Sequence, residues 1–229
     1  MMKSTIRRAE YEEIYRRLDE VAPLPFDCGI LCGSVCCGTG DEVWKENPTF
    51  KNGSISGPGL EQTITVYGSS EEQEAVASET GELCDEPEMG IYLLPGEEKV
   101  FSRKEDWLVW SVEQAEDHDF PESWKGKIYF VRCKTPPDCP REKRPIQCRT
   151  FPLSPHFTEN GRLVLILNDL DLPYRCPLIE DKMELDQDFL TVTHTCWQRL
   201  VGDPLIRDLV QMESHLRCEN GETPNVVFP

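Results

Sequence analysis

The chain has 229 residues, and its 24 Lys and Arg against 42 Asp and Glu give a formal net charge of −18. That length fits one domain with embellishments. Nucleic acids and anionic membranes bind to basic surfaces, so this charge argues against a nucleic-acid partner and against a membrane partner.

The start of the chain and its hydropathy predict the compartment. The first 22 residues are charged throughout and lack the apolar core of a secretory signal. No stretch approaches the roughly 18 apolar residues of a membrane helix. We therefore expect a cytoplasmic protein. In a reducing cytosol its eleven cysteines indicate metal or redox chemistry more than disulfides.

The N-terminal third divides into a helix, a knuckle and an acidic segment. Residues 4–20 carry apolar side chains at helical spacing and predict an amphipathic helix. Residues 26–40, FDCGILCGSVCCGTG, form a Cys/Gly knuckle whose small residues let the backbone wrap closely. Residues 52–98 contain eleven acidic residues and no Lys or Arg, so we expect a solvated acidic loop at 68–88.

Short strands are expected between turn-rich segments, where apolar and β-branched residues alternate or cluster. The last two candidates flank a Glu-Asn-Gly turn, which is typical of a hairpin. The candidates are residues 62–67, 91–94, 128–133, 156–158 and 162–167.

Two further helical regions are predicted. Residues 102–105, Ser-Arg-Lys-Glu, form a capping box, so a helix is expected from there to about residue 116. Residues 186–216 read as two helical stretches broken at 202–204, Gly-Asp-Pro, because an Asp before a Pro is a natural helix start.

Together these elements predict an irregular α+β fold. A loop-rich cysteine core with a few short strands would be flanked by helices at both ends. We expect a single domain over residues 1–229, with a cysteine-cluster core at 26–177, an acidic insertion at about 51–89 and a C-terminal helical region at 185–217.

Eight of the eleven cysteines fall into two groups. The first is C-x3-C-x3-C-C, and the second is C-x5-C-x8-C followed by the Cys of Tyr-Arg-Cys-Pro. Thiolates hold zinc and iron–sulfur clusters, and four of them satisfy a tetrahedral ion. Adjacent side chains point in different directions, so the Cys-Cys pair indicates a bridge between two sites or one residue that is not a ligand. The candidate metal ligands are Cys28, Cys32, Cys36, Cys37, Cys133, Cys139, Cys148 and Cys176.

An alternative is that these cysteines are ordinary core residues, since free cysteines are often buried. The first three are joined by glycines and not by an apolar period, which argues against this reading. For Cys84, Cys196 and Cys218 the structural role is the one expected.

A basic patch accompanies the second cysteine group. Residues 125–149 hold eight Lys or Arg and two acidic residues. Four thiolates around Zn²⁺ or a [4Fe–4S]²⁺ core carry a net charge of about −2, and nearby cations stabilise thiolates. We therefore expect Arg144 and Arg149 to orient or neutralise the cysteine core as cofactor-binding residues. The patch could also pair with the acidic loop, or receive an anionic ligand.

The segment CPREKRPIQCRTFPL, residues 139–153, resembles a zinc- or iron-chelating family of bacterial and archaeal cysteine-cluster proteins (the CxxxCxxCC, or YkgJ-like, proteins). The resemblance covers residues 26–177 in pieces, with 51–89 as an insertion. Three residues lie between Cys32 and Cys36 where the family has two. The resemblance implies binding of zinc or iron and no assigned activity. The matching residues are the knuckle 28–37, Leu94–Glu97, Cys133, Cys139, Arg144-Pro145, Cys148-Arg149, Phe151-Pro152 and Cys176.

The function expected is metal binding, of zinc or alternatively of iron or a [4Fe–4S] cluster, in a module whose surface binds a protein partner. The alternative is an iron–sulfur redox or methyl-transfer-associated enzyme. A Pro follows Cys139 and Cys176 as in ferredoxin loops, and a related motif occurs in bacterial flagellin lysine methylases. A metal chaperone or sensor is a third reading. The four His have no hydrolase spacing, so no catalytic residue is predicted, and the oligomeric state stays open.

Overall fold

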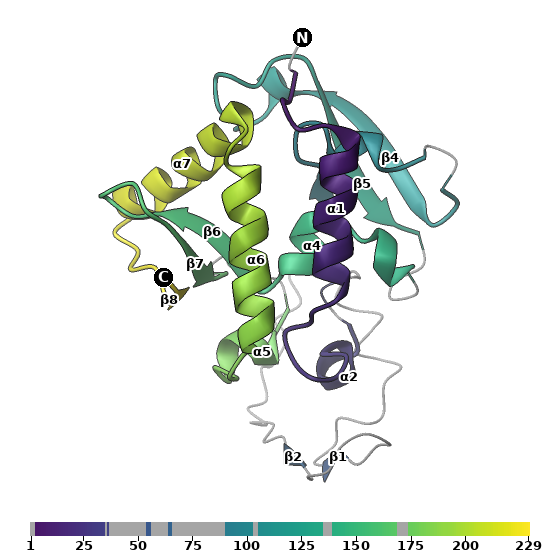
Figure 1. Ribbon diagram of the computed structural model, residues 1–229, viewed down its shortest axis with the longest axis vertical. Helices are drawn as coiled ribbons and strands as arrows, with labels where there is room; N and C mark the ends of the chain where they lie inside the picture. The colour runs from purple at the N-terminus through teal and green to yellow at the C-terminus, as the bar shows by residue number, and fades with distance from the viewer. Residues whose placement is uncertain are drawn as a thin grey trace, which may run out of the picture.

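Helices and antiparallel strands both contribute to the computed structural model of the protein (Figure 1). It describes residues 3–34, 36, 90–102, 105–134, 139–168 and 174–229, and the backbone alone of 54–55 and 64–65. The helices described are α1 (Arg8–Asp19), α2 (Gly29–Cys32), α4 (Ile146–Thr150), α5 (Pro177–Glu180), α6 (Gln187–Leu200) and α7 (Pro204–Glu219), with 3₁₀ turns η3 (Glu97–Lys99), η4 (Ala115–Asp117) and η5 (Arg141–Lys143).

The described strands pair into small antiparallel sheets. Together with the helices, these sheets confirm the predicted α+β class. The sheets are β1 (Ser54–Ile55) with β2 (Ile64–Thr65), then β3 (Ile91–Tyr92), β5 (Lys127–Cys133) and β4 (Leu108–Gln114) in the order β3-β5-β4, and finally β6 (Leu153–Phe157), β7 (Leu163–Leu167) and β8 (Val226–Phe228) in the order β6-β7-β8.

Helices α1 and α6 lie side by side at the centre of the molecule (Figure 1). The buried side chains of α1 recur every three or four residues, which places them on one face toward the main core. Helix α7 packs on β6, and α6 packs on β7 and β8. No helix in the described residues is long and apolar enough to cross a membrane.

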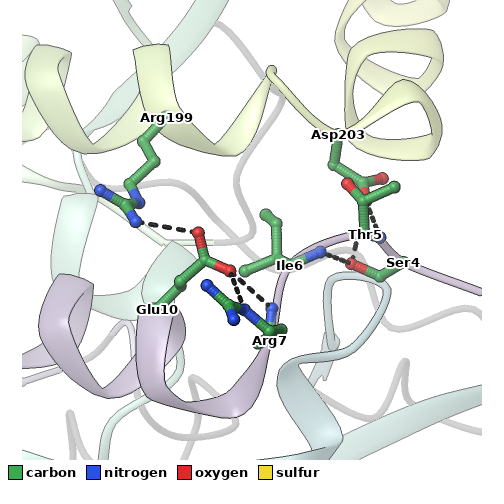
Figure 2. Close-up of polar contacts among 7 residues, drawn as sticks. All are labelled: Ser4, Thr5, Ile6, Arg7, Glu10, Arg199 and Asp203. Carbon is green, nitrogen blue, oxygen red and sulfur yellow. Dashed lines mark hydrogen bonds and ion pairs between the residues drawn. The ribbon is translucent and has the colours of Figure 1, made fainter.

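The N-terminal segment is fastened to the C-terminal helices by one carboxylate (Figure 2). Asp203 caps α7, because its Oδ1 accepts the backbone N–H groups of Leu205 and Ile206 at 2.9 and 3.3 Å. Its Oδ2 accepts the Ser4 hydroxyl at 3.0 Å, the Thr5 N–H at 2.5 Å and the Thr5 hydroxyl at 2.8 Å. Only 1% of Asp203 is exposed, so these donors replace the water that a charged group requires.

A second contact, at the surface, joins α1 to α6 (Figure 2). Glu10 accepts the Arg7 backbone N–H at 3.1 Å, and its other oxygen accepts Arg199 of α6 at 2.8 Å. The backbone bond from Arg7, followed by the Arg199 guanidinium, lowers the pKa of Glu10 to about 2. Glu10 therefore stays charged at neutral pH and links α1 to α6.

Several predicted elements are present close to their expected bounds. The N-terminal helix begins at Arg8 and not at residue 4, because Ser4 and Thr5 bond to Asp203. The hairpin β6-β7 turns through Gly161, whose φ of +77° favours glycine, and the tail contains α6 and α7 as predicted. The predicted strand at 62–67 contains β2, whereas the acidic loop at 68–88 lies outside the described residues.

The helix predicted from 102 to about 116 is wrong. Residues 108–114 form β4, which pairs with β5 from Leu108 opposite Cys133 to Gln114 opposite Lys127. The segment LVWSVEQ is rich in β-branched and aromatic residues, which fit a pleated surface. Glu105 bonds to the Ser102 backbone, as in a capping box, but no helix follows, and its carboxylate also pairs with Lys143 at 2.8 Å.

We predict that Asp203→Ala lowers the free energy of unfolding by about 2–4 kcal/mol, since it removes a helix cap together with the part-buried hydrogen bonds to Ser4 and Thr5. The matched control is Asp186→Ala, because the Asp186 side chain caps α6 through the N–H groups of Asp188 and Phe189, and its bond to the distant Pro23 is made by the backbone, which the substitution keeps. That variant should lose about 1 kcal/mol. Equal losses in denaturant unfolding would show that Asp203 acts only as a cap.

Candidate metal centre

The first cysteine group is built around one turn of helix. Helix α2 begins directly after Cys28 and ends with Cys32, so the four-residue spacing places both side chains on one face. The Ser34 N–H then bonds back to the Gly29 carbonyl oxygen at 3.0 Å. A Cβ at Gly29 would lie 2.2 Å from the Ser34 hydroxyl oxygen, so a larger residue there would have to displace the Ser34 side chain.

Four thiols line one small cavity. Cys28, Cys32 and Cys36 come from the first group, and Cys176, which directly precedes α5, joins them from a distant part of the chain. The cavity has a volume of about 40 Å³, which suits a single ion or a water-sized species. Its other polar lining residues are Asp27, Ser34, Arg144 and Tyr174.

The second cysteine group joins the end of a strand to a short helix. Cys133 is the last residue of β5, and Cys148 lies in α4. The thiols of Cys133 and Cys139 are in hydrogen-bond contact, and that contact is the main reason why the pKa of Cys133 is raised. Residues separated by a loop in the sequence are therefore adjacent in space.

Arg144 lies between the two groups. Its Nε donates a hydrogen bond to Cys139 Sγ at 3.0 Å, and the same residue lines the cavity of the first group. Cys36 lies near both groups as well, because ionisation of its thiol would raise the pKa values of both Cys28 and Cys148. The fold therefore brings the two cysteine groups next to each other.

Burial keeps these thiols protonated in the absence of a cation. Loss of hydration, with a smaller contribution from neighbouring thiolates, raises the pKa of Cys28 and of Cys176 to about 11. The pKa of Cys148 is also raised, although this residue is exposed, and neighbouring thiolates contribute to the rise. A divalent cation reverses this balance, because it deprotonates the thiols that bind it.

Arg149 is held inside the protein beside Cys148. Only 4% of its side chain is exposed. Its Nε donates to the Arg144 carbonyl oxygen at 2.7 Å, and its Nη1 donates to Asp19 Oδ1 at 3.1 Å. The guanidinium also lies 4.5 Å from the ring centroid of Tyr15. These contacts hold Arg149 in place next to the second cysteine group, whereas cofactor binding by Arg144 and Arg149 stays a prediction.

The thiols are neighbours but do not converge on one point. Among the described residues, no three Cys, His, Asp or Glu side chains are grouped so that they could hold a metal ion as they stand. Cys37 and Cys84 lie outside the described residues. Cys196 is buried in α6, in keeping with the packing role expected of it, whereas Cys218 is exposed on α7. Sequence reasoning missed Tyr174 and Ser34 as cavity-lining residues, because no spacing rule links them to the cysteines.

We predict that Arg149→Met lowers the free energy of unfolding by about 2–3 kcal/mol, because it leaves the Arg144 carbonyl and Asp19 without their buried partner. Arg141→Met is the control. Arg141 is 46% exposed and lies 3.9 Å from Asp27, so its loss should cost less than about 0.5 kcal/mol. Similar losses in thermal unfolding would contradict a structural role for Arg149.

Comparison with known proteins adds no relative to this description. No family model, no curated protein and no solved structure matches the chain. The resemblance of residues 26–177 to the cysteine-cluster family stays a prediction from the motif alone.

Proposed function

We propose that this protein binds a metal ion through its clustered cysteines, zinc in the first place and iron or a [4Fe–4S] cluster as the alternative. One observation carries the proposal. Seven described thiols from segments far apart in the sequence gather around Arg144, which donates a hydrogen bond to one of their sulfurs. Ordinary core cysteines pack singly among apolar side chains, as Cys196 does here.

The two groups suggest how the ligands divide. Cys28, Cys32, Cys36 and Cys176 would hold the first ion, because four thiolates satisfy tetrahedral zinc. Cys133, Cys139 and Cys148 would contribute to a second ion or to an extended cluster. The thiols would have to move closer together on binding, which is expected where metal binding and local folding are coupled.

The chemistry that such a centre supplies here is structural. The segment from 26 to 34 and the segment from 139 to 152 hold few large buried apolar side chains. A tetrathiolate zinc site contributes on the order of 10 kcal/mol of folding free energy, which offsets the ordering entropy of such loops. On this proposal the protein is a cytoplasmic metal-binding module with a protein partner.

A specific contact favours the second candidate, an iron–sulfur redox or methyl-transfer-associated enzyme. The N–H of Arg144 donates to Cys139 Sγ, and hydrogen bonds to cluster sulfurs are one way in which proteins tune the reduction potential of iron–sulfur centres. Visible absorbance separates the two candidates, because iron–sulfur proteins are coloured and zinc proteins are not.

The proposal is tested by titrating the metal-free protein with cobalt(II), a spectroscopic substitute for zinc, followed by competition with zinc and a chelator. Cys28→Ser and Cys148→Ser should each weaken the affinity for the metal at least about tenfold and reduce the thiolate-to-cobalt absorption. Cys218→Ser is the control, because Cys218 is exposed on α7 and should leave both unchanged. If all three variants bind as the unmodified chain does, these cysteines are not ligands.

A further inference from the structure

A buried carboxylate lies close to the cysteine groups without belonging to them. Glu97 is only 1% exposed, although ionised Glu side chains are almost never buried without strong partners. Burial raises its pKa, and hydrogen bonds together with the nearby Arg149 act in the opposite direction. Because burial of this side chain costs free energy, we expect it to have a structural role.

Glu97 binds three separate elements. Its Oε1 accepts the Tyr15 hydroxyl of α1 at 2.6 Å and the backbone N–H of Ile146 at 2.8 Å. Its Oε2 accepts the Leu94 N–H at 2.9 Å within its own turn. Gly96 precedes it with a φ of +95°, and this backbone conformation, which favours glycine, aims the side chain into the protein.

The Ile146 N–H is the first of α4, the helix that carries Cys148. A helix of five residues cannot hold its own conformation in water, so its position depends on tertiary contacts. Near its other end Arg149 binds Asp19 of α1. Helix α4 is therefore fastened to α1 near both ends, with Glu97 at the start and Arg149 close to the finish.

Helix α1 leads in turn to the first cysteine group. Helix α1 ends at Asp19, and a short segment connects it to Cys28, the residue that directly precedes α2. Through Tyr15 the Glu97 carboxylate thus contacts the helix before Cys28, and through Ile146 it contacts the helix that contains Cys148. Glu97 therefore contacts both the helix that precedes the first cysteine group and the helix that carries Cys148 of the second.

We propose that Glu97 is a positioning residue of the metal centre, which sets the distance between the Cys148 helix and the segment that carries Cys28. The inference rests on the proposed function. It goes further in that metal affinity, and not stability alone, depends on this carboxylate.

The test compares isosteric variants of two equally buried carboxylates. Glu97→Gln removes one acceptor from the junction of α1 and α4, whereas Asp203→Asn removes one from the junction of the two ends of the chain. Asp203 is a fair control, because it is also 1% exposed and its partners precede α1, at the end of the helix away from Cys28. Tyr15→Phe is a milder variant that removes a single hydrogen bond to Glu97.

Affinity for cobalt(II) and zinc is measured at a temperature at which far-UV circular dichroism shows every variant to be folded. Glu97→Gln should weaken binding about tenfold or more and change the cobalt spectrum, as loss of an orienting partner does at other metal sites. Tyr15→Phe should act in the same direction but less. Asp203→Asn should lower stability and keep the affinity of the unmodified chain.

The inference is overturned if Glu97→Gln loses stability as Asp203→Asn does but binds metal with unchanged affinity and spectrum. If Glu97→Gln does not fold, Tyr15→Phe decides in the same way, and unchanged affinity there overturns the inference. If the unmodified chain binds neither metal, the proposed function fails and this inference fails with it. The unmodified protein therefore separates the two failures.

Discussion

Three hydrogen bonds to the buried carboxylate of Glu97 join α1, the turn before η3 and the first residue of α4. Placing a charged group where almost no water reaches it costs free energy, and each of these donors offsets part of that cost. The result is a junction with fixed geometry, because removal of any donor leaves a buried carboxyl oxygen without one of its hydrogen bonds. Next to this junction lie the segments 26–34 and 139–152, which hold few large buried apolar side chains.

Basic side chains near the cysteine groups pair with acidic side chains. Within a chain of net charge −18, the basic residues between 139 and 149 bind to nearby groups. Lys143 pairs with Glu105 and Arg141 approaches Asp27, while Arg149 reaches Asp19. In the described residues the basic patch thus neutralises the surroundings of the thiols, where the raised pKa values show that negative charge is otherwise unfavourable.

The sequence predicted those features whose signals are local. The tail helices follow from the Asp-Pro start at Asp203, and the β6-β7 hairpin follows from the turn at Gly161. The strand β4 was predicted as a helix because a capping-box pattern at 102–105 outweighed the β-branched and aromatic composition after it. Pairing with β5 makes this segment a strand. The pairing partner lies elsewhere in the chain, so a short window of sequence does not contain that information.

The candidate site likewise combines features with a local sequence signal and features that depend on distant segments of the chain. That Cys28, Cys32 and Cys36 lie close together could be predicted from their spacing in the sequence. The contact of Arg144 with both groups and the function of Glu97 could not, because each depends on segments brought together from distant parts of the chain. A Glu after Pro-Gly has no signature of burial until its three donors are in place.

The central claim is that these cysteines hold a metal, and metal analysis with a visible spectrum of anaerobically purified protein tests it most directly. The account predicts one or two equivalents of zinc or iron per chain, retained through dialysis and lost only to a strong chelator. A spectrum without absorbance would then indicate zinc, and a broad visible band would indicate an iron–sulfur cluster. Protein that contains less than about a tenth of an equivalent, and takes up neither metal when its thiols are fully reduced, would contradict the account.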